Sequence, residues 1–353
     1  KNYDRMKELL KDGTIARSQY DAAEAGFTAA QADLARAEQA VSEAQTGRSF
    51  SVITAPFAGR VIDRYAEPGD TALPGGALLK LYDPTRLRLE YGRRRDYGTT
   101  AGFEFTRIAP NAWAGRALLT GLKPGKTYHY RLFLADGTPV SEDAAFNTAP
   151  TREADFSFGA WSDSQTGNGG DWHDASEPAR SMFRHMAASG VAFGLSAGDV
   201  VQSGTSYSDC RRYYLDNVAR ALGPVAPWYV AWGNHDASAT NAPMRLASDM
   251  PSRYRPGFTP GHGSFRFTYA NCFFVCIDHF DYAALRGTNS WIRRTLESEA
   301  ARQARFRIVA IHVPPYCERW IDGSKMLRET LVPLMEECNV DICFSGHTHE
   351  YGR

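Results

Sequence analysis

The sequence predicts a multidomain α/β protein whose C-terminal part, from about residue 155, is a layered sandwich of sheets and helices. Two observations predict this fold class. From residue 155 onward, short apolar runs rich in β-branched and aromatic residues alternate with stretches long enough for helices, and such alternation is typical of layered α/β domains. The chain has 353 residues, which is enough for two or three domains, and its earlier part lacks this alternation.

The composition limits the classes of partner. Lys and Arg number 40, as do Asp and Glu, so the formal net charge is zero and no nucleic-acid partner is expected. No run of 18 uninterrupted apolar residues occurs, which predicts that no transmembrane segment is present. The chain starts at Lys1 rather than Met, so the lack of a signal peptide is uninformative. The six cysteines form no C-x-x-C pair, which favours buried thiols over disulfides.

The first element is a long helix within residues 1–50. Its small and apolar residues recur at alternating steps of three and four, which forms a heptad seam, and alanine within the seam permits close approach of another helix. The seam consists of Tyr20, Ala23, Phe27, Ala30, Leu34, Ala37, Val41 and Ala44. We predict a coiled-coil arm, with a single amphipathic helix as the alternative.

Residues 51–90 change to short strands and turns. They contain I-T-A-P-F-x-G-x-V, then E-P-G-D, then G-x-x-L-x-x-L. Together with the helix, these motifs resemble a periplasmic adaptor (membrane fusion) protein of efflux and secretion systems. The resemblance covers residues 3–90 and implies a hairpin helix over 1–50, part of a lipoyl-like β segment over 51–90, and efflux-system partners.

Residues 91–150 contain a turn and a strand with aromatic alternation in 118–132, closed by Phe146-Asn-Thr-Ala-Pro150. This pattern resembles part of a fibronectin-III-like module of the kind that precedes the catalytic domain in purple acid phosphatases. Its early strands are missing, so two incomplete domains meet near Glu90. We predict a junction between residues 90 and 91, arising either from gene fusion or from sequence assembly.

Residues 151–353 supply the alternating elements of the predicted sandwich. Strands are expected at 156–161, 191–195, 228–232, 265–267, 272–277, 306–311 and 341–344, and helices at 177–188, 210–221, 291–303 and 326–337. The strand at 228–232 stops at Gly233, which frees the backbone for a tight loop.

Polar side chains follow five of these strands. They are Asp163 and Gln165, then Asp199, then Asn234, His235 and Asp236, then His312, and finally His347 and His349. Strand ends of an α/β sheet gather at one edge, where ligands bind. Carboxylate, amide and imidazole donors suit zinc, manganese or iron. A shared carboxylate can hold two such ions about 3.5–4 Å apart in a hydrolytic site.

The ordered blocks D-x-Q, G-D, G-N-H-D, H-x-P-P and G-H-T-H resemble the calcineurin-like metallophosphoesterase superfamily, nearest to purple acid phosphatases. The resemblance implies a four-layer α/β sandwich and two metal ions (Fe, Zn or Mn). It also implies hydrolysis of a phosphate-ester substrate, a monoester or a diester, by metal-bound hydroxide. The chain ends four residues after His349, so we expect the domain to be truncated at its C-terminus.

The same resemblance implies a role for each residue. Asp163 and His349 bind the first metal, and Asp199 bridges both. The second metal is bound by Asn234, His312 and His347. His235 stabilises the transition state or protonates the leaving oxygen, and Asp236 orients its imidazole.

Two positions depart from the family pattern. Gln202 stands where purple enzymes have a metal-binding Tyr, so no phenolate charge-transfer colour is expected. Gln165 stands where many members have His, and its amide either ligates the first metal or hydrogen-bonds there. Among the other histidines, His173 and His262 are expected in solvated loops and His279 in a structural role, while His129 and His185 are expected on the surface.

Two other functions remain as alternatives: a periplasmic adaptor subunit, suggested by residues 3–90, and a non-catalytic metal-binding domain, suggested by Gln165. Both resemblances imply an extracytoplasmic setting, either periplasmic or secreted.

Overall fold

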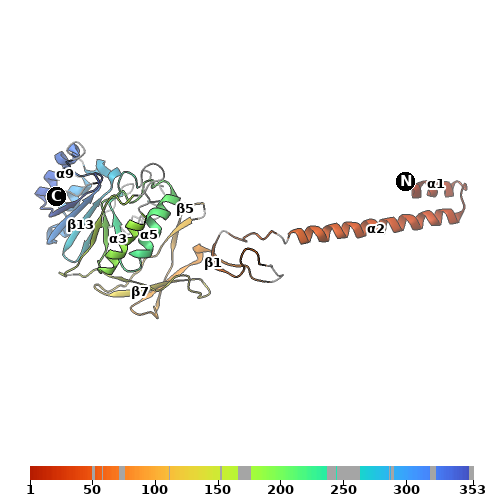
Figure 1. Ribbon diagram of the computed structural model, residues 1–353, viewed down its shortest axis with the longest axis horizontal. Helices are drawn as coiled ribbons and strands as arrows, with labels where there is room; N and C mark the ends of the chain where they lie inside the picture. The colour runs from red at the N-terminus through yellow and green to blue at the C-terminus, as the bar shows by residue number, and fades with distance from the viewer. Residues whose placement is uncertain are drawn as a thin grey trace. The chain divides into compact units, whose positions relative to one another are not determined.

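The computed structural model forms two compact units, Lys1–Ala58 and Gly59–Arg353 (Figure 1). It describes residues 1–49, 52–57, 59–70, 76–110, 112–151, 153–165, 176–236, 244, 263–285, 287, 290–318 and 323–349. His173 and His262 therefore lie outside the described residues. In the part of the chain that is described, no helix is both long and apolar enough to cross a membrane.

The first unit contains two helices, α1 (Asn2–Lys11) and α2 (Arg17–Ser49), and α1 folds back alongside α2 (Figure 1). The Tyr3 ring stacks on the Phe27 ring with centroids 4.7 Å apart. The start of the predicted seam therefore packs against a helix of the same chain. Leu34, farther along the seam, is 59% exposed, and the coiled coil stays a prediction.

The second unit begins with strands that are all antiparallel. They are β1 (Arg60–Arg64), β2 (Leu79–Tyr82), β3 (Arg88–Gly92), β4 (Thr99–Ala101), β5 (Glu104–Ala109), β6 (Ala112–Arg116), β7 (Thr127–Phe133) and β8 (Ala144–Asn147), with the 3₁₀ turn η1 (Pro84–Arg86) before β3. They form the pairs β1–β2 and β5–β6 and a sheet of order β4-β3-β7-β8. Strand β3 crosses the predicted junction at 90/91, and its residues from Arg88 to Gly92 all pair with β7.

Two sheets form the centre of the remaining structure. The first contains β9 (Gly159–Trp161), β10 (Gly194–Ser196) and β11 (Trp228–Val230), which are parallel in the order β11-β10-β9. The second contains β12 (Phe265–Tyr269), β13 (Cys272–Ile277), β14 (Phe306–Ile311) and β15 (Ile342–Phe344), of which the last three are parallel. An aromatic core joins the sheets, with the Phe193 and Phe274 rings edge to face at 5.2 Å.

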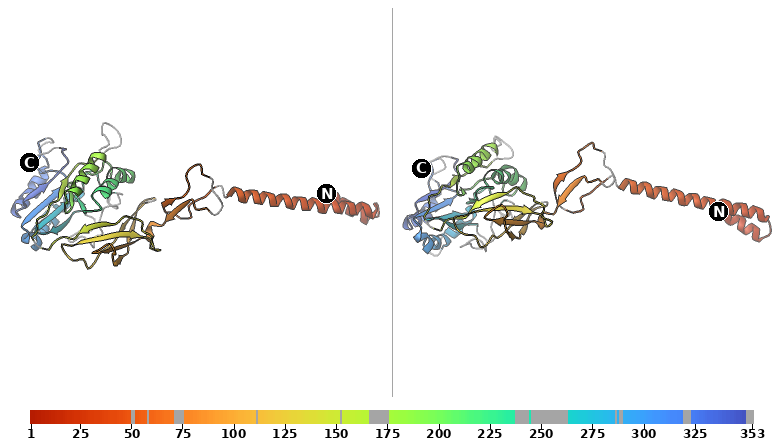
Figure 2. Two further views of the ribbon diagram at one scale, coloured as in Figure 1. Left: turned by 60° about the horizontal axis from the view of Figure 1, so that its bottom comes forward. Right: turned by 90° about the horizontal axis from the view of Figure 1, so that it is seen from below.

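Helices cover the outer faces of both sheets (Figure 1, Figure 2). The first sheet packs against α3 (Ser176–Ala188), the π-helix η2 (Cys210–Leu215) and α5 (Asp216–Ala221), and the short helix α4 (Tyr207–Asp209) directly precedes η2. The second packs against η4 (His279–Leu285), α7 (Trp291–Leu296), α8 (Glu299–Gln303) and α9 (Lys325–Glu337). This order of helix, sheet, sheet and helix confirms the layered α/β fold class.

Two predicted helices differ from the structure. The helix expected at 210–221 contains a π-helical turn, which buries the adjacent Tyr213 and Tyr214; such wider turns are uncommon and frequently occur near functional sites. The helix expected at 291–303 is interrupted because the Ser298 side chain accepts from Ala301 N and starts a new helix. All six cysteines are free thiols, three of them buried.

Candidate metal centre

The loops that follow five strands meet at the carboxyl ends of the two sheets. Asp163 N donates to Gly198 O at 3.0 Å, which joins the loops after β9 and β10. Gly346 N donates to His312 O at 2.9 Å, which joins the loops after β15 and β14. Between the sheets, His347 N donates to both carboxylate oxygens of Asp163, at 3.0 and 2.8 Å. The structure therefore brings the predicted strand-end residues together.

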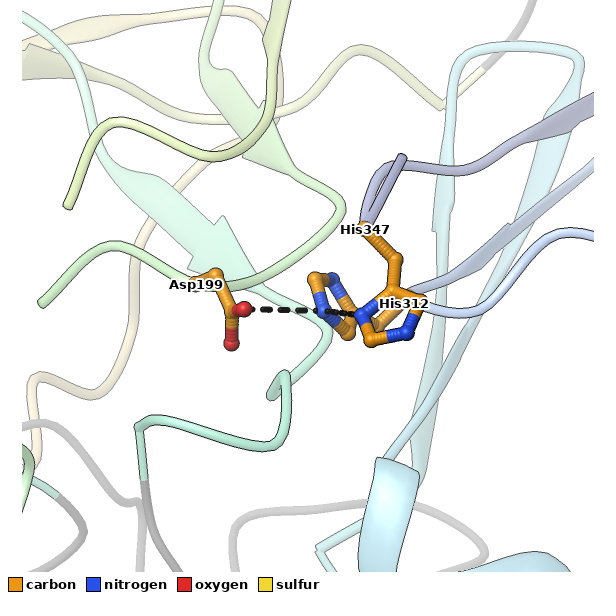
Figure 3. A group of neighbouring side chains, drawn as sticks. All are labelled: Asp199, His312 and His347. Atoms are coloured by element: carbon orange, nitrogen blue, oxygen red, sulfur yellow. Dashed lines mark hydrogen bonds and ion pairs between the residues drawn. The ribbon is translucent and has the colours of Figure 1, made fainter. Parts of the chain in front are cut away.

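Asp199, His312 and His347 form a tight group at this edge (Figure 3). One ligand atom from each lies within 4.8 Å of the others. His312 Nε2 is 3.1 Å from Asp199 Oδ2, 3.1 Å from Asn234 Oδ1 and 3.2 Å from His347 Nδ1. Asp199 and His312 are buried. Four potential metal-donor atoms thus converge at this edge, two of them on buried side chains and two on partly buried ones.

The ring orientation of His312 fits metal binding. Its Nδ1 lies 2.9 Å from Ala197 O, an acceptor, so Nδ1 carries a proton and the Nε2 lone pair faces the group. Burial alone would lower the pKa of His312, but the adjacent Asp199 carboxylate raises it above its ordinary value. A position that favours positive charge among oxygen and nitrogen lone pairs has the chemistry of a cation site.

A second group lies beside the first. His349 Nε2 is 3.5 Å from Asp163 Oδ1, and Gln165 Nε2 is 3.5 Å from His349 Nε2. The Gln165 side chain is buried, with 7% exposure, and its Oε1 has no hydrogen-bond partner among the residues that the structure describes. A buried amide oxygen without a partner is costly, and a bound cation would satisfy it. This second donor set also fits a metal ion.

Several of these residues hold strained backbone. Asp163, Asp199, His347 and His349 have φ values of 52°, 49°, 72° and 54°. A left-handed conformation costs a residue with a Cβ roughly 1–2 kcal/mol. Such strain persists where the surroundings enforce it and is concentrated at functional sites.

Two glycines leave room for the carboxylates. A Cβ on Gly233 would lie 2.2 Å from Asp199 Oδ1, and a Cβ on Gly346 would lie 1.8 Å from Ser162 Oγ and 2.2 Å from Asp163 Oδ2. Glycine is therefore required in the G-N-H-D and G-H-T-H blocks, because neighbouring side chains lie too close to the backbone there to leave space for a Cβ.

The predicted partnership between His235 and Asp236 is wrong. His235 Nδ1 bonds to Gln202 O at 3.0 Å, so a backbone carbonyl orients the imidazole. Asp236 is fully buried and accepts from four backbone N–H groups, those of Asp199, Val200, Val201 and Gly233. Four fixed donors take up both carboxylate oxygens, so Asp236 joins the loops that carry Asp199 and Asn234.

Burial, followed by the charge of Asp199, raises the pKa of Asp236 to about 7. The backbone N–H groups act in the opposite direction, because they stabilise the ionised carboxylate.

Sequence reasoning missed the position of one histidine. The His279 ring centroid lies 6.2 Å from that of His312, so His279 adjoins the metal-donor group. Burial, and then the charges of His312 and His347, lower the pKa of His279 to about 4. One signal in the sequence could have predicted this position: His279 follows β13 closely, as the other site residues follow their strands.

The two histidines expected on the surface differ. His185 on α3 is exposed. His129 is instead half-buried, with its Nδ1 3.0 Å from Asp143 Oδ2.

Comparisons with known proteins agree with this geometry. A family model described as calcineurin-like phosphoesterase matches residues 170–351. Probable purple acid phosphatase 20 of Arabidopsis thaliana is 22% identical over 271 residues, which cover 72% of this chain and 59% of that protein. Purple acid phosphatase 18 of the same plant is 27% identical over 185 residues, which cover 49% of this chain and 41% of that protein.

Among solved structures, purple acid phosphatase PPD1 from yellow lupin (Lupinus luteus) shares the fold with a TM-score of 0.61 and 17% identity. The match covers 76% of this chain and 55% of the lupin chain. The chain thus spans between about two fifths and three fifths of the length of these relatives.

Proposed function

Because the chain belongs to the calcineurin-like phosphoesterase family, we propose that it is a binuclear metal-dependent phosphoesterase that hydrolyses phosphate monoesters or diesters. The observation that carries this proposal is the convergence of carboxylate, amide and imidazole donors from five strand ends into one site. His235 lies beside the donors, and the Gln202 carbonyl orients its ring. A non-catalytic metal-binding domain would not need such a histidine.

Two groups of residues would hold the metals. Asp163 and His349 belong to the first position, Asn234, His312 and His347 to the second, and Asp199 is shared. Two divalent ions, or a divalent and a trivalent ion, of Fe, Zn or Mn would make water a nucleophile near neutral pH and offset charge on the phosphoryl oxygens.

The protein's own groups prepare the site for that chemistry. His235 N donates to Asp199 Oδ1 at 2.9 Å, which fixes the histidine next to the shared carboxylate. Its Nδ1 donates to Gln202 O, so the proton that the imidazolium form can transfer would reside on Nε2. From there it would stabilise the phosphoryl group or protonate the leaving oxygen. The role of Asp236 in this proposal is to hold the two loops in place.

The test combines metal analysis with hydrolysis of nitrophenyl phosphate and bis(nitrophenyl) phosphate. Two metals per chain and turnover of one or both esters are expected, and Asp199→Ala is expected to abolish both metal loading and turnover. The matched control is His185→Ala, an exposed residue of α3 outside the site. Absence of both metal and turnover in the parent chain would contradict the proposal.

Finer features of the chain are also proposals. The sheet of β3, β4, β7 and β8, with the nearby β5–β6 hairpin, supports a partial fibronectin-III-like module. The hairpin of α1 and α2 supports the adaptor resemblance of the N-terminal segment, with efflux-system partners. The extracytoplasmic location follows from these resemblances together and is tested by fractionating cells that express the chain.

A further inference from the structure

The Gln165 amide is an incompletely satisfied polar group beside the first metal position. We propose that its oxygen ligates the metal held by Asp163 and His349, and that this makes the two metal positions chemically unequal. The Gln165 position then admits Mn²⁺ more readily than the position of His312 and His347, which selects Zn²⁺. This inference rests on the proposed function, because it concerns the metals of the same site.

The burial of the Gln165 side chain indicates that its amide oxygen needs a partner. Only 7% of the surface of Gln165 is exposed, and no described residue offers its Oε1 a hydrogen bond. Leaving such an oxygen buried and unpaired costs about 1–3 kcal/mol. A metal ion removes that cost, because an amide oxygen is a suitable ligand for a divalent cation.

The Gln165 amide lies beside the donors of the first metal position. Gln165 N donates to Asp199 O at 3.0 Å, so the backbone of Gln165 is tied to the residue shared by both metals. The side-chain Nε2 reaches to 3.5 Å from His349 Nε2. The amide oxygen is bonded to the same carbon as the Gln165 nitrogen, so it also lies close to the donors of the first position.

The two metal positions differ in their proportions of oxygen and nitrogen donors. The first position combines two carboxylates and the Gln165 amide oxygen with a single imidazole, that of His349. The second position combines one carboxylate and one amide oxygen with two imidazoles, those of His312 and His347. Oxygen ligands suit manganese and magnesium, whereas imidazole suits zinc, iron and copper. The two positions should therefore select different ions from a mixture.

The experiment is competitive metal loading of the full chain. The parent protein and its variants are dialysed against Mn²⁺ in large excess over a low concentration of Zn²⁺, because Zn²⁺ binds oxygen and nitrogen ligands more tightly than Mn²⁺ does. Metal content is measured by plasma mass spectrometry, and bound Mn²⁺ is followed by electron paramagnetic resonance. The parent is expected to load one of each ion. Gln165→Leu is expected to lower Mn²⁺ affinity at least about tenfold, since even outer-shell changes have effects of that size. Gln165→His is expected to exchange Mn²⁺ for a second Zn²⁺.

Gln303→His is the matched control, because Gln303 lies on the exposed face of α8 and bonds to Glu299 at 2.8 Å. Its metal content should equal that of the parent. If Gln165→Leu unfolds, as circular dichroism would show, Gln165→His decides the question alone. Identical metal selection in parent and Gln165→His overturns the inference and leaves the proposed function standing. A parent chain that binds neither ion overturns both.

Discussion

Replacement of Asp236 by Asn is expected to destabilise the sandwich strongly, although Asp236 lies outside the proposed metal-ligand set. Oδ2 of Asp236 accepts from Asp199 N at 2.8 Å and Gly233 N at 2.9 Å, and Oδ1 accepts from Val200 N and Val201 N. Asn keeps one acceptor oxygen, so its NH₂ group would face two of these four donors. Two buried N–H groups then lose their partner.

Each unsatisfied buried donor costs about 1–3 kcal/mol, so the two together cost about 2–6 kcal/mol, and removal of the buried charge, whose burial raises the pKa of Asp236, offsets part of this cost. That is a large share of the roughly 5–15 kcal/mol by which a domain is stable. Urea unfolding followed by circular dichroism measures the change, and it should be done above pH 7, where the carboxylate is ionised.

The control for this measurement is Asp216→Asn, a half-exposed carboxylate of α5 that forms an ion pair with Arg211. A change within about 0.5 kcal/mol is expected there. If Asp236→Asn shifts the free energy of unfolding no more than this control does, the inference that Asp236 holds the two loops together is refuted.

Three further predictions concern the site and its neighbours. Gly346→Ala should reduce metal loading while the helices persist, because the added Cβ would lie 1.8 Å from Ser162 Oγ; unchanged metal content would contradict this. His235→Ala should lower kcat about 10²–10⁴-fold with unchanged metal content, and loss of metal would instead show that His235 has a structural role. Asp143→Asn should destabilise the protein by at most about 1 kcal/mol at neutral pH. Burial raises the pKa of Asp143, but hydrogen bonds from His129 and Tyr97 outweigh burial and lower it. The difference between parent and variant should therefore be present above the unfolded pKa of 3.8 and disappear as pH falls through the lower folded value, and a difference that persists in acid would contradict the assignment.

Much of the site could be predicted because its residues follow strands directly. Asp199, His312 and His347 each come within three residues of the end of β10, β14 or β15. Parallel strands of one sheet end at a common edge, which groups His312 with His347, and the stacking of the two sheets brings the end of β10 with Asp199 to the same place. Position along the chain therefore predicted proximity in space for this group.

Hydrogen-bond partners could not be predicted in the same way. The sequence places Asp236 next to His235, and adjacency suggested a side-chain pair. The structure turns Asp236 inward to four backbone donors, while the carbonyl of Gln202 orients the imidazole. Every residue has a carbonyl and nearly every residue an N–H group, so residue type carries no signal for either contact. The same limit applies to the π-helical turn at Cys210–Leu215, which depends on tertiary packing.

The two hydrogen-bonding carboxylates explain how the strained backbone of the site is held. Asp199 has φ of 49°, and its N–H donates to Asp236 at 2.8 Å. His347 has φ of 72°, and its N–H donates to Asp163 at 2.8 and 3.0 Å. Glycine would relieve the strain at Asp199 and at His347, but it has no side chain that could bind a metal. The fold thus holds each residue in a left-handed conformation by giving its N–H a carboxylate partner. This arrangement keeps both side chains directed at the proposed metals before any ion binds.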